Sequence, residues 1–346
     1  MSRMKIQNIE ALRAVAALIV VAIHIEPLFS RLGIAVPKGG VDLFFVISGF
    51  IMVVIARDEL PGKFLWRRVA RVVPLYWVLT LFTFGAALIL PAFFHNTTAD
   101  AADLVRSLFF MTFVKDGATI PQPILFVGWT LNYEAFFYAL FALGLAFGRR
   151  GVWLPVAAIL ALVLAGVAFR PSDPVMAFYT APILLEFLFG MGVGFAYLYT
   201  KPIAVQVAIP VFVVSLVAML YGDHFVQFDR AFVAGLPAAF FLTSTLALEG
   251  QKWTLPDFKL GGASYAIYLT HPFIAGVVML LYARLPPNPA IAFGLILATG
   301  VAVCTAGLVV FYLFERPTTQ WLLSVAGHGA SAVKVKARVT PSVPRT

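Results

Sequence analysis

The sequence predicts an all-α integral membrane bundle of about ten transmembrane helices. Of its 346 residues, 61% are hydrophobic and only 12% are charged, and the mean hydropathy is +0.94. A soluble domain could not cover its surface with so few polar groups. At about 20 residues per span, the apolar stretches account for about ten helices and leave no room for a second globular domain.

Ten apolar stretches follow one another, and each is expected to form one span. They cover 9–28, 40–56, 73–94, 126–147, 152–169, 177–199, 203–221, 231–248, 263–283 and 290–314. The first is expected to be a retained anchor and not a signal peptide, because Glu10, Arg13 and His24 interrupt it. The transmembrane domain is thus predicted over 1–321.

Two segments outside the spans have their own character. Residues 100–114 are expected to lie as a helix on the outer membrane surface. Residues 322–346, rich in Gly, Ser, Ala and Lys, are expected to form a flexible basic cytoplasmic tail.

The basic residues predict the orientation of the chain. With a cytoplasmic N-terminus, eighteen of the 25 lysines and arginines fall on the inner side of the membrane, leaving seven outside. Because basic connections are retained in the cytoplasm, both termini are expected there. The net charge of +9 then reflects topology and attraction to anionic lipid. Nucleic acid is therefore not an expected partner.

Arg13 and His24 are eleven residues apart in the first apolar stretch. Eleven steps of a helix return to within about 20° of the starting direction, about 16 Å further along the axis, so both side chains are expected on one face. Arginine inside a bilayer costs about 2.5–3.5 kcal/mol, which marks such residues as functional candidates. The pair suits a long anionic substrate lying along the helix. Taken singly, each also fits a snorkelling arginine or a histidine bonded to a neighbouring helix.

A second basic cluster precedes the third span. Arg68 and Arg71 are three residues apart and therefore neighbours on one helical face. Arginine forks suit phosphate oxygens, and two of them suit a diphosphate. The alternative is a positively charged anchor beside an aromatic belt, at the cytoplasmic start of the span.

Further polar residues stand inside apolar sequence. They are Asp42, Glu134, Glu186 (expected in mid-span), Ser264, Tyr268 and His271. The last three follow at i, i+4 and i+7 and so share a face. By depth, His24, Asp42 and Glu134 belong to the outer half of the membrane and His271 to its middle. Two histidines and two carboxylates can build a proton-transfer site or a structural hydrogen-bond network, and depth leaves both open.

Several kinds of site are not expected. Cys304 is the only cysteine, which excludes an internal disulfide and a cysteine metal cluster. No histidine cluster has metal-ligand spacing, so neither a metal nor a permanently bound cofactor is predicted. His95 and Asp100 have the spacing of glycerolipid acyltransferases. Their expected outer loop, however, lies away from any cytoplasmic donor.

Several motifs occur in the order seen in acyltransferase family 3. They are Arg13-x10-His24, the segment 40–50, Arg68-x-x-Arg71 followed by Pro74-Leu-Tyr-Trp77, Trp129-Thr-Leu-Asn-Tyr-Glu134, the segment 264–272 and Glu315-Arg-Pro317. The chain resembles that family from residue 7 to about 317. Among its members, it looks most like the succinoglycan-type exopolysaccharide acetyltransferases.

The resemblance implies a bacterial inner-membrane enzyme that moves an acyl group, in this subfamily acetyl, from cytoplasmic acyl-CoA to a glycan hydroxyl on the far side. It implies that Arg13, Arg68 and Arg71 hold the donor and that His24 serves as general base or transient acyl carrier. Glu134 or Asp42 is expected to orient His24. Ser264, Tyr268, His271, Glu186 and Glu315 complete the candidate pocket.

The expected partners are the lipid bilayer, acyl-CoA, a glycan or lipid-linked oligosaccharide acceptor, and polysaccharide-synthesis proteins. Two other classes of function fit the same residues. A proton-coupled transporter or flippase would use the histidines and carboxylates as a relay. A non-catalytic scaffold subunit would need none of them for chemistry.

Overall fold

The computed structural model describes residues 6–90, 100–115, 118, 120–221, 229–250, 253–256 and 258–327, and in these ranges the chain is helical without a strand, as predicted. The α-helices are α1 (Gln7–His24), α2 (Glu26–Ser30), α3 (Gly40–Ile51), α4 (Pro61–Ile89), α5 (Ala101–Leu108), α6 (Trp129–Leu145), α7 (Trp153–Phe169), α8 (Pro174–Tyr179), α9 (Leu185–Tyr199), α10 (Val205–Tyr221), α11 (Leu236–Gly250), α12 (Leu260–Tyr282), α13 (Pro289–Val310) and α14 (Arg316–Val325). Short 3-10 turns cover Phe126–Gly128, Gly148–Val152 and Pro182–Leu184, and π turns cover Met52–Ala56, Ala231–Gly235 and Phe311–Glu315.

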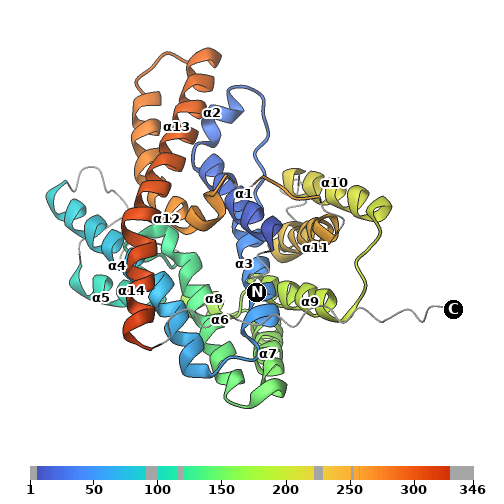
Figure 1. Cartoon of the computed structure of the whole chain (residues 1–346). Coiled ribbons are helices and arrows are strands. Elements are labelled where there is room, and N and C mark those ends of the chain that lie inside the picture. The colour runs from blue at the N-terminus through green and yellow to red at the C-terminus, as the bar shows by residue number, and fades with distance from the viewer. Residues whose placement is uncertain are drawn as a thin grey trace.

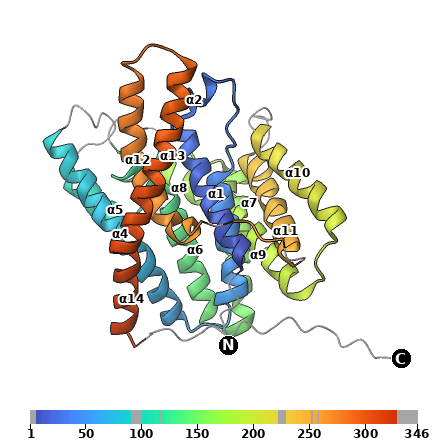
Figure 2. The same cartoon turned by 45° about the horizontal axis from the view of Figure 1, so that its top comes forward.

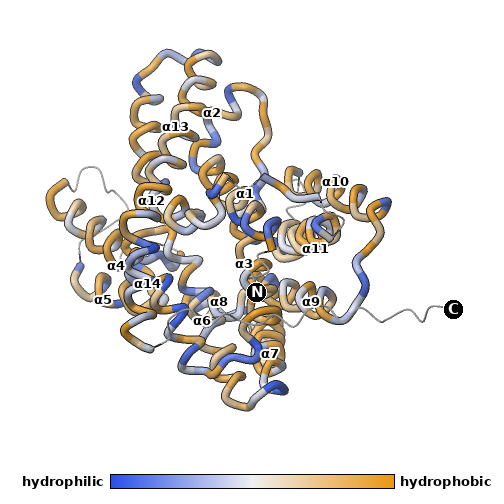
Figure 3. The backbone as a smooth tube through the Cα atoms, viewed as in Figure 1, coloured by the Kyte–Doolittle hydropathy of each residue, from blue (hydrophilic) through white to orange (hydrophobic). Residues whose placement is uncertain are grey.

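Seven helical segments of the described chain are long and apolar enough to cross a membrane. They are Gln7–His24, Pro61–Ile89, Gly148–Phe169, Pro174–Tyr199, Ala231–Glu249, Leu260–Tyr282 and Pro289–Val325, and two shorter apolar helices are Gly40–Ala56 and Val205–Tyr221. Hydrophobic residues run along most of these helices (Figure 3). The total of about ten spans and the cytoplasmic position of both termini stay predictions.

The helices are arranged around α1 and α3 (Figure 1). α1 packs against α3, α11 and α12, and α3 packs against α9. α12 and α13 form a long hairpin, α4 lies beside α14 and α5, and α10 pairs with α11 on the opposite side of the molecule (Figure 2). This arrangement surrounds the polar residues of α1 with helices from both halves of the sequence.

One predicted boundary was wrong. α4 begins at Pro61, twelve residues before the predicted span, because proline is well suited to the first turn of a helix. The predicted span 177–199 lies within the apolar segment Pro174–Tyr199; a turn at Pro182–Leu184 divides that segment, and Glu186, near its middle as predicted, lies in the first turn of α9. α14 continues across position 321 to Val325, and the predicted limit of the transmembrane domain at 321 stays a prediction. Most of the predicted tail, from 328 on, lies outside the described residues.

The predicted surface helix is shorter than expected. Asp100 caps α5 by accepting a hydrogen bond from the Asp103 amide at 2.9 Å, but the helix ends at Leu108. Phe110 adopts a positive φ of 57°, which breaks the helical path. Nearby, burial lowers the pKa of Lys115 to about 8, with Asp103 opposing the shift.

A close helix contact depends on glycines of α3 and α9. A Cβ on Gly190 would lie 1.9 Å from the Val46 carbonyl oxygen, and one on Gly49 would lie 2.0 Å from the Phe187 carbonyl oxygen. No side chain fits at these positions unless the two helix backbones separate. Small residues allow this kind of close approach in membrane helix pairs.

Gly190→Ala is therefore expected to destabilise the detergent-solubilised protein by about 1–3 kcal/mol, the usual cost of overpacking. Gly192→Ala on the same helix is the matched control, since a Cβ there would meet nothing within 4 Å. Thermal unfolding followed by circular dichroism compares the two. Equal melting temperatures for both variants and the parent would show that the contact is not needed.

Candidate active site

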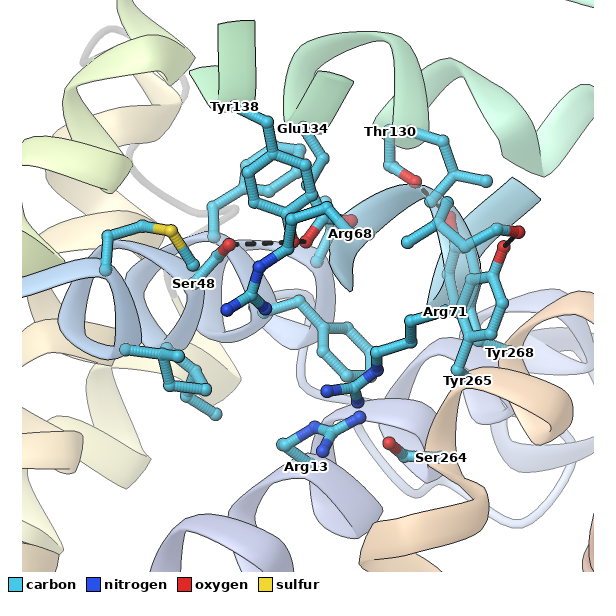
Figure 4. Close-up of a pocket in the computed structure, with 18 residues that line it drawn as sticks. Arg13, Ser48, Arg68, Arg71, Thr130, Glu134, Tyr138, Ser264, Tyr265 and Tyr268 are labelled. Carbon is cyan, nitrogen blue, oxygen red and sulfur yellow. Dashed lines mark hydrogen bonds between the residues drawn. The ribbon is translucent and has the colours of Figure 1, made fainter. Parts of the chain in front are cut away.

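Three arginines from two helices converge on one pocket (Figure 4). Arg13 comes from α1, and Arg68 and Arg71 come from α4; α3, α6 and α12 supply the remaining walls. The pocket holds about 750 Å³ of empty space, counting its open mouth. We call it the arginine pocket. It brings together the three basic residues that the sequence assigned to a phosphate-bearing donor.

The local sequence of α4 explains how two of these arginines reach the pocket. Since α4 begins at Pro61, Arg68 and Arg71 lie two to three turns inside the helix, not at its start as expected. Arg68 packs its guanidinium over the rings of Phe64 and Tyr138, at 5.4 and 5.5 Å from the ring centroids. Such stacking holds an arginine in place while leaving its edge available to an anion.

The charges around Arg13 are partly balanced. Its side chain is 10% exposed and lies 3.8 Å from a Glu10 oxygen. Glu315 and Glu134 attract its charge as well, while Arg71 repels it. Glu315 closes the π turn Phe311–Glu315, and its buried Oε2 has no hydrogen-bond partner within the described chain. An anionic ligand would relieve the repulsion between the arginines.

Glu134 belongs to the arginine pocket. It accepts hydrogen bonds from Ser48, at 3.2 Å, and from Tyr138 one turn further along α6. We expected Glu134 or Asp42 beside His24, and the structure places neither there. Depth along a helix gives the level of a residue but not the direction in which it points, which is why this expectation failed.

His24 faces His271 instead. His24 is the last residue of α1, and its Nδ1 lies 3.3 Å from Nε2 of His271, with the two rings edge to face at 4.7 Å. The centroid of the Phe126 ring lies 5.5 Å from the centroid of the His24 ring. His271 is fully buried and His24 is partly exposed. The two histidines that the sequence placed at different depths therefore meet.

Tyr268 separates this pair from the arginine pocket. Its hydroxyl donates to the Val127 carbonyl at 2.8 Å and hydrogen-bonds to Thr130 at 2.7 Å, and both Tyr268 and Thr130 line the pocket (Figure 4). The backbone carbonyl oxygen of Tyr268 lies 2.6 Å from Nδ1 of His271. Ser264, one turn earlier on α12, lines the pocket too. The stripe predicted from Ser264 through Tyr268 to His271 thus leads from the pocket to the histidines.

The face of α1 between Arg13 and His24 is not open. Ala17 packs in a cluster with Ala263 and Ile267 of α12, and Val20 lies against α3; both are buried. The pocket walls nearest the histidines come from α3, α6 and α12. A long substrate would therefore follow Phe44, Thr130 and Tyr268, and not α1 itself as the sequence suggested.

Asp42 and Glu186 form a separate polar cluster. Asp42 is fully buried and accepts two hydrogen bonds from Arg230, from Nε at 2.9 Å and from Nη2 at 2.8 Å. Glu186, also fully buried, interacts electrostatically with both residues. The cluster joins the first turns of α3 and α9 to the π turn Ala231–Gly235. Its observed contacts are those of a structural connection between helices.

The sequence analysis did not identify three residues that the structure places in the pocket or against a predicted site residue. Ser48 was quoted only as part of a motif, and the contact of Tyr265 with the pocket was not foreseen. Arg230 was assigned only to the outer surface. The sequence does contain an indication for Arg230. A basic residue on the predicted outer side, next to an apolar stretch, is unusual, and this position indicates a buried acid as its partner.

The chain is similar to a known protein family and to a curated protein. The family model described as "Acyltransferase domain" (Acyl_transf_3) matches residues 6–308. The chain is 37% identical over 288 residues to the exopolysaccharide production protein ExoZ of Rhizobium meliloti (strain 1021), which covers 80% of this chain and 88% of that protein. No solved structure matches the chain. The apolar helices together with this match identify a multi-pass membrane protein. The chain belongs to the acyltransferase 3 family.

Proposed function

We propose that this protein is a transmembrane O-acyltransferase that transfers an acyl group from cytoplasmic acyl-CoA to a hydroxyl of an exopolysaccharide or its lipid-linked precursor. One observation carries the proposal: three arginines and Tyr268 line one pocket, and the Tyr268 carbonyl contacts His271, which lies beside His24. Acyltransferase family membership and the likeness to ExoZ give the reaction class and the acceptor class.

The arginine pocket suits the nucleotide end of acyl-CoA. Its phosphates would contact Arg13, Arg68 and Arg71, since guanidinium groups bind phosphate oxygens in pairs of hydrogen bonds. The apolar walls of α3 and α6, with Phe44 and Leu131, suit the extended arm of the donor. The thioester would then reach Tyr268 and the histidines behind it.

Two routes lead from this arrangement to product. In the first, His24 takes the proton of the acceptor hydroxyl as its oxygen attacks the thioester carbonyl. The carbon–sulfur bond breaks, and the leaving thiolate receives that proton, so that an ester and free CoA result. In the second, His24 itself attacks the thioester carbonyl, and the carbon–sulfur bond breaks to release the CoA thiolate. The acceptor hydroxyl then takes the acyl group from His24, and its proton goes to the thiolate. Both routes place His24 at the reacting carbonyl.

The finer assignments are part of the same proposal. We propose acetyl as the transferred group, the bacterial inner membrane as the location, and no permanently bound cofactor. Both termini would be cytoplasmic, so that the arginine pocket opens to the compartment that holds acyl-CoA. His24 would lie toward the far side, where a surface glycan is available.

The test uses inverted membrane vesicles that contain the protein. Acetyl-labelled CoA is added outside, and a lipid-linked or polymeric saccharide fraction is enclosed. Label on the enclosed saccharide, absent in vesicles without the protein, is the expected result. Label that stays outside with every acyl donor and acceptor tried would contradict the proposal. A proton-coupled carrier built from the same residues would not bind acyl-CoA at all, so a direct binding assay separates the two classes.

A further inference from the structure

His271 stands beside His24 in an arrangement that fixes where each ring carries its proton. Its Nδ1 lies 2.6 Å from the Tyr268 carbonyl oxygen, and its Nε2 lies 3.3 Å from Nδ1 of His24. Nδ1 of His24 lies 2.8 Å from the Val20 carbonyl oxygen as well. A carbonyl oxygen only accepts hydrogen bonds, so the nitrogen next to it must donate.

The sequence explains why the Tyr268 carbonyl is available. In an α-helix this oxygen would accept from the backbone N–H four residues later, and that residue is Pro272, which has none. The freed carbonyl lies in a fully buried part of α12, where an unpaired acceptor is costly. The Nδ1–H of His271 supplies the missing donor. The Tyr268-x-x-His271-Pro272 sequence thereby makes Nε2 of His271 an acceptor.

The same logic carries over to His24. Its Nδ1 faces two acceptors, the Val20 carbonyl and Nε2 of His271, so the proton of the neutral ring belongs on Nδ1. Nε2 of His24 then carries the lone pair, and within the described chain it has no hydrogen-bond partner. This is the nitrogen that can take a proton or an acyl group.

We propose that His271 is a positioning residue that holds the proton of His24 on Nδ1, so that Nε2 of His24 is the reactive nitrogen. When His24 gains a positive charge during transfer, the same Nδ1–H to Nε2 hydrogen bond becomes charge-assisted and stabilises the cation. His271 thus does for His24 what a carboxylate does for the histidine of a hydrolase triad, with a neutral ring in place of an anion. The inference rests on the proposed function of His24.

The kinetic test compares two variants at one position. His271→Leu removes the acceptor and is expected to lower kcat about 10–100-fold, with the KM for acetyl-CoA changed less than about twofold. His271→Gln keeps an amide oxygen at a similar reach and is expected to recover most of that loss. Turnover of the Leu variant within twofold of the parent would overturn the proposal. So would a Gln variant as slow as Leu, because packing and not hydrogen bonding would then be the role of His271.

A spectroscopic test does not depend on activity. In protein labelled with 15N-histidine, two-bond nitrogen–proton correlations report which nitrogen of each of the five histidines is protonated. The His24 signals are identified by their loss in His24→Gln. We expect the Nδ1–H form for His24 and His271, and a mixture for His271 in Pro272→Ala, where a new backbone N–H competes for the Tyr268 carbonyl. An Nε2–H form of either ring in the parent would overturn the proposal.

These two tests separate this inference from the proposed function. If no donor and acceptor pair gives transfer, the proposed function fails, while the nitrogen spectra still decide how the histidine pair is protonated. If transfer occurs and depends on His24, but His271→Leu is as active as the parent, only the positioning role fails.

Discussion

His24→Ala is expected to lower acetyl transfer in the vesicle assay by about 10²–10⁴-fold, the usual contribution of a positioned general acid–base group. The reason is geometric. His24 is partly exposed at the end of α1, beside His271, whose Nδ1 contacts the carbonyl oxygen of the pocket residue Tyr268. Without its ring, the group proposed to take the proton of the acceptor hydroxyl is lost. Binding of acetyl-CoA should change little, because the arginines are untouched.

Two controls make this result specific. Ile23→Ala alters the neighbouring residue on a different face of α1 and should leave transfer within about twofold of the parent. Acetyl-CoA binding, measured on the same His24→Ala preparation, shows whether the pocket is intact. Transfer that persists in His24→Ala would remove this residue from the chemistry and favour a scaffold role for the membrane domain.

The route through His24 can be resolved with the same proteins. If His24 carries the acyl group, labelled donor without acceptor should leave label on the parent protein after rapid quenching, and none on His24→Ala. If His24 acts as a general base, neither protein retains label. Either outcome agrees with an essential His24, so this measurement chooses between routes and does not test the role itself.

The sequence predicted the helical class and grouped Arg13, Arg68 and Arg71, which line one pocket, because both predictions depend on local patterns. Apolar runs indicate membrane helices, and the spacing of Arg68 and Arg71 puts them on one face whatever surrounds the helix. Arg13 and His24 do lie on one continuous helix, α1, as their spacing required. Motif order contributed the family, which the match over residues 6–308 bears out.

The contacts that the sequence did not reveal are those between distant helices. His24 and His271 are separated by 247 positions, and Asp42 and Arg230 by 188. Periodicity within one helix says nothing about which neighbour covers each face, so Glu134 was expected beside His24, whereas it contacts Ser48 and Tyr138. The boundary error at Pro61 arose because hydropathy follows composition, whereas proline is favoured where a helix begins.

Arg71→Ala and Arg68→Ala should each weaken acetyl-CoA binding, with little effect on the chemical step. A hydrogen bond to a charged group contributes about 1.5–3 kcal/mol, so losing one corresponds to about a 10–150-fold rise in the KM for acetyl-CoA. Arg71→Ala is expected to change acetyl-CoA binding with less disturbance of other contacts than Arg68→Ala. Arg68 also packs on Phe64 and Tyr138, so its removal disturbs a hydrogen-bond donor to Glu134 as well.

Arg67→Ala is the matched control on the same helix. Arg67 carries the same charge but pairs with Glu59 and does not line the arginine pocket, so its loss should leave the KM within about twofold of the parent. An equal rise in the KM for Arg67→Ala and Arg71→Ala would mean that long-range attraction by the total positive charge brings in the donor. The geometry of the pocket would then not be the cause. Repeating the titration at high salt separates these explanations, because steering by exposed charges fades with ionic strength while contacts inside a largely buried pocket persist.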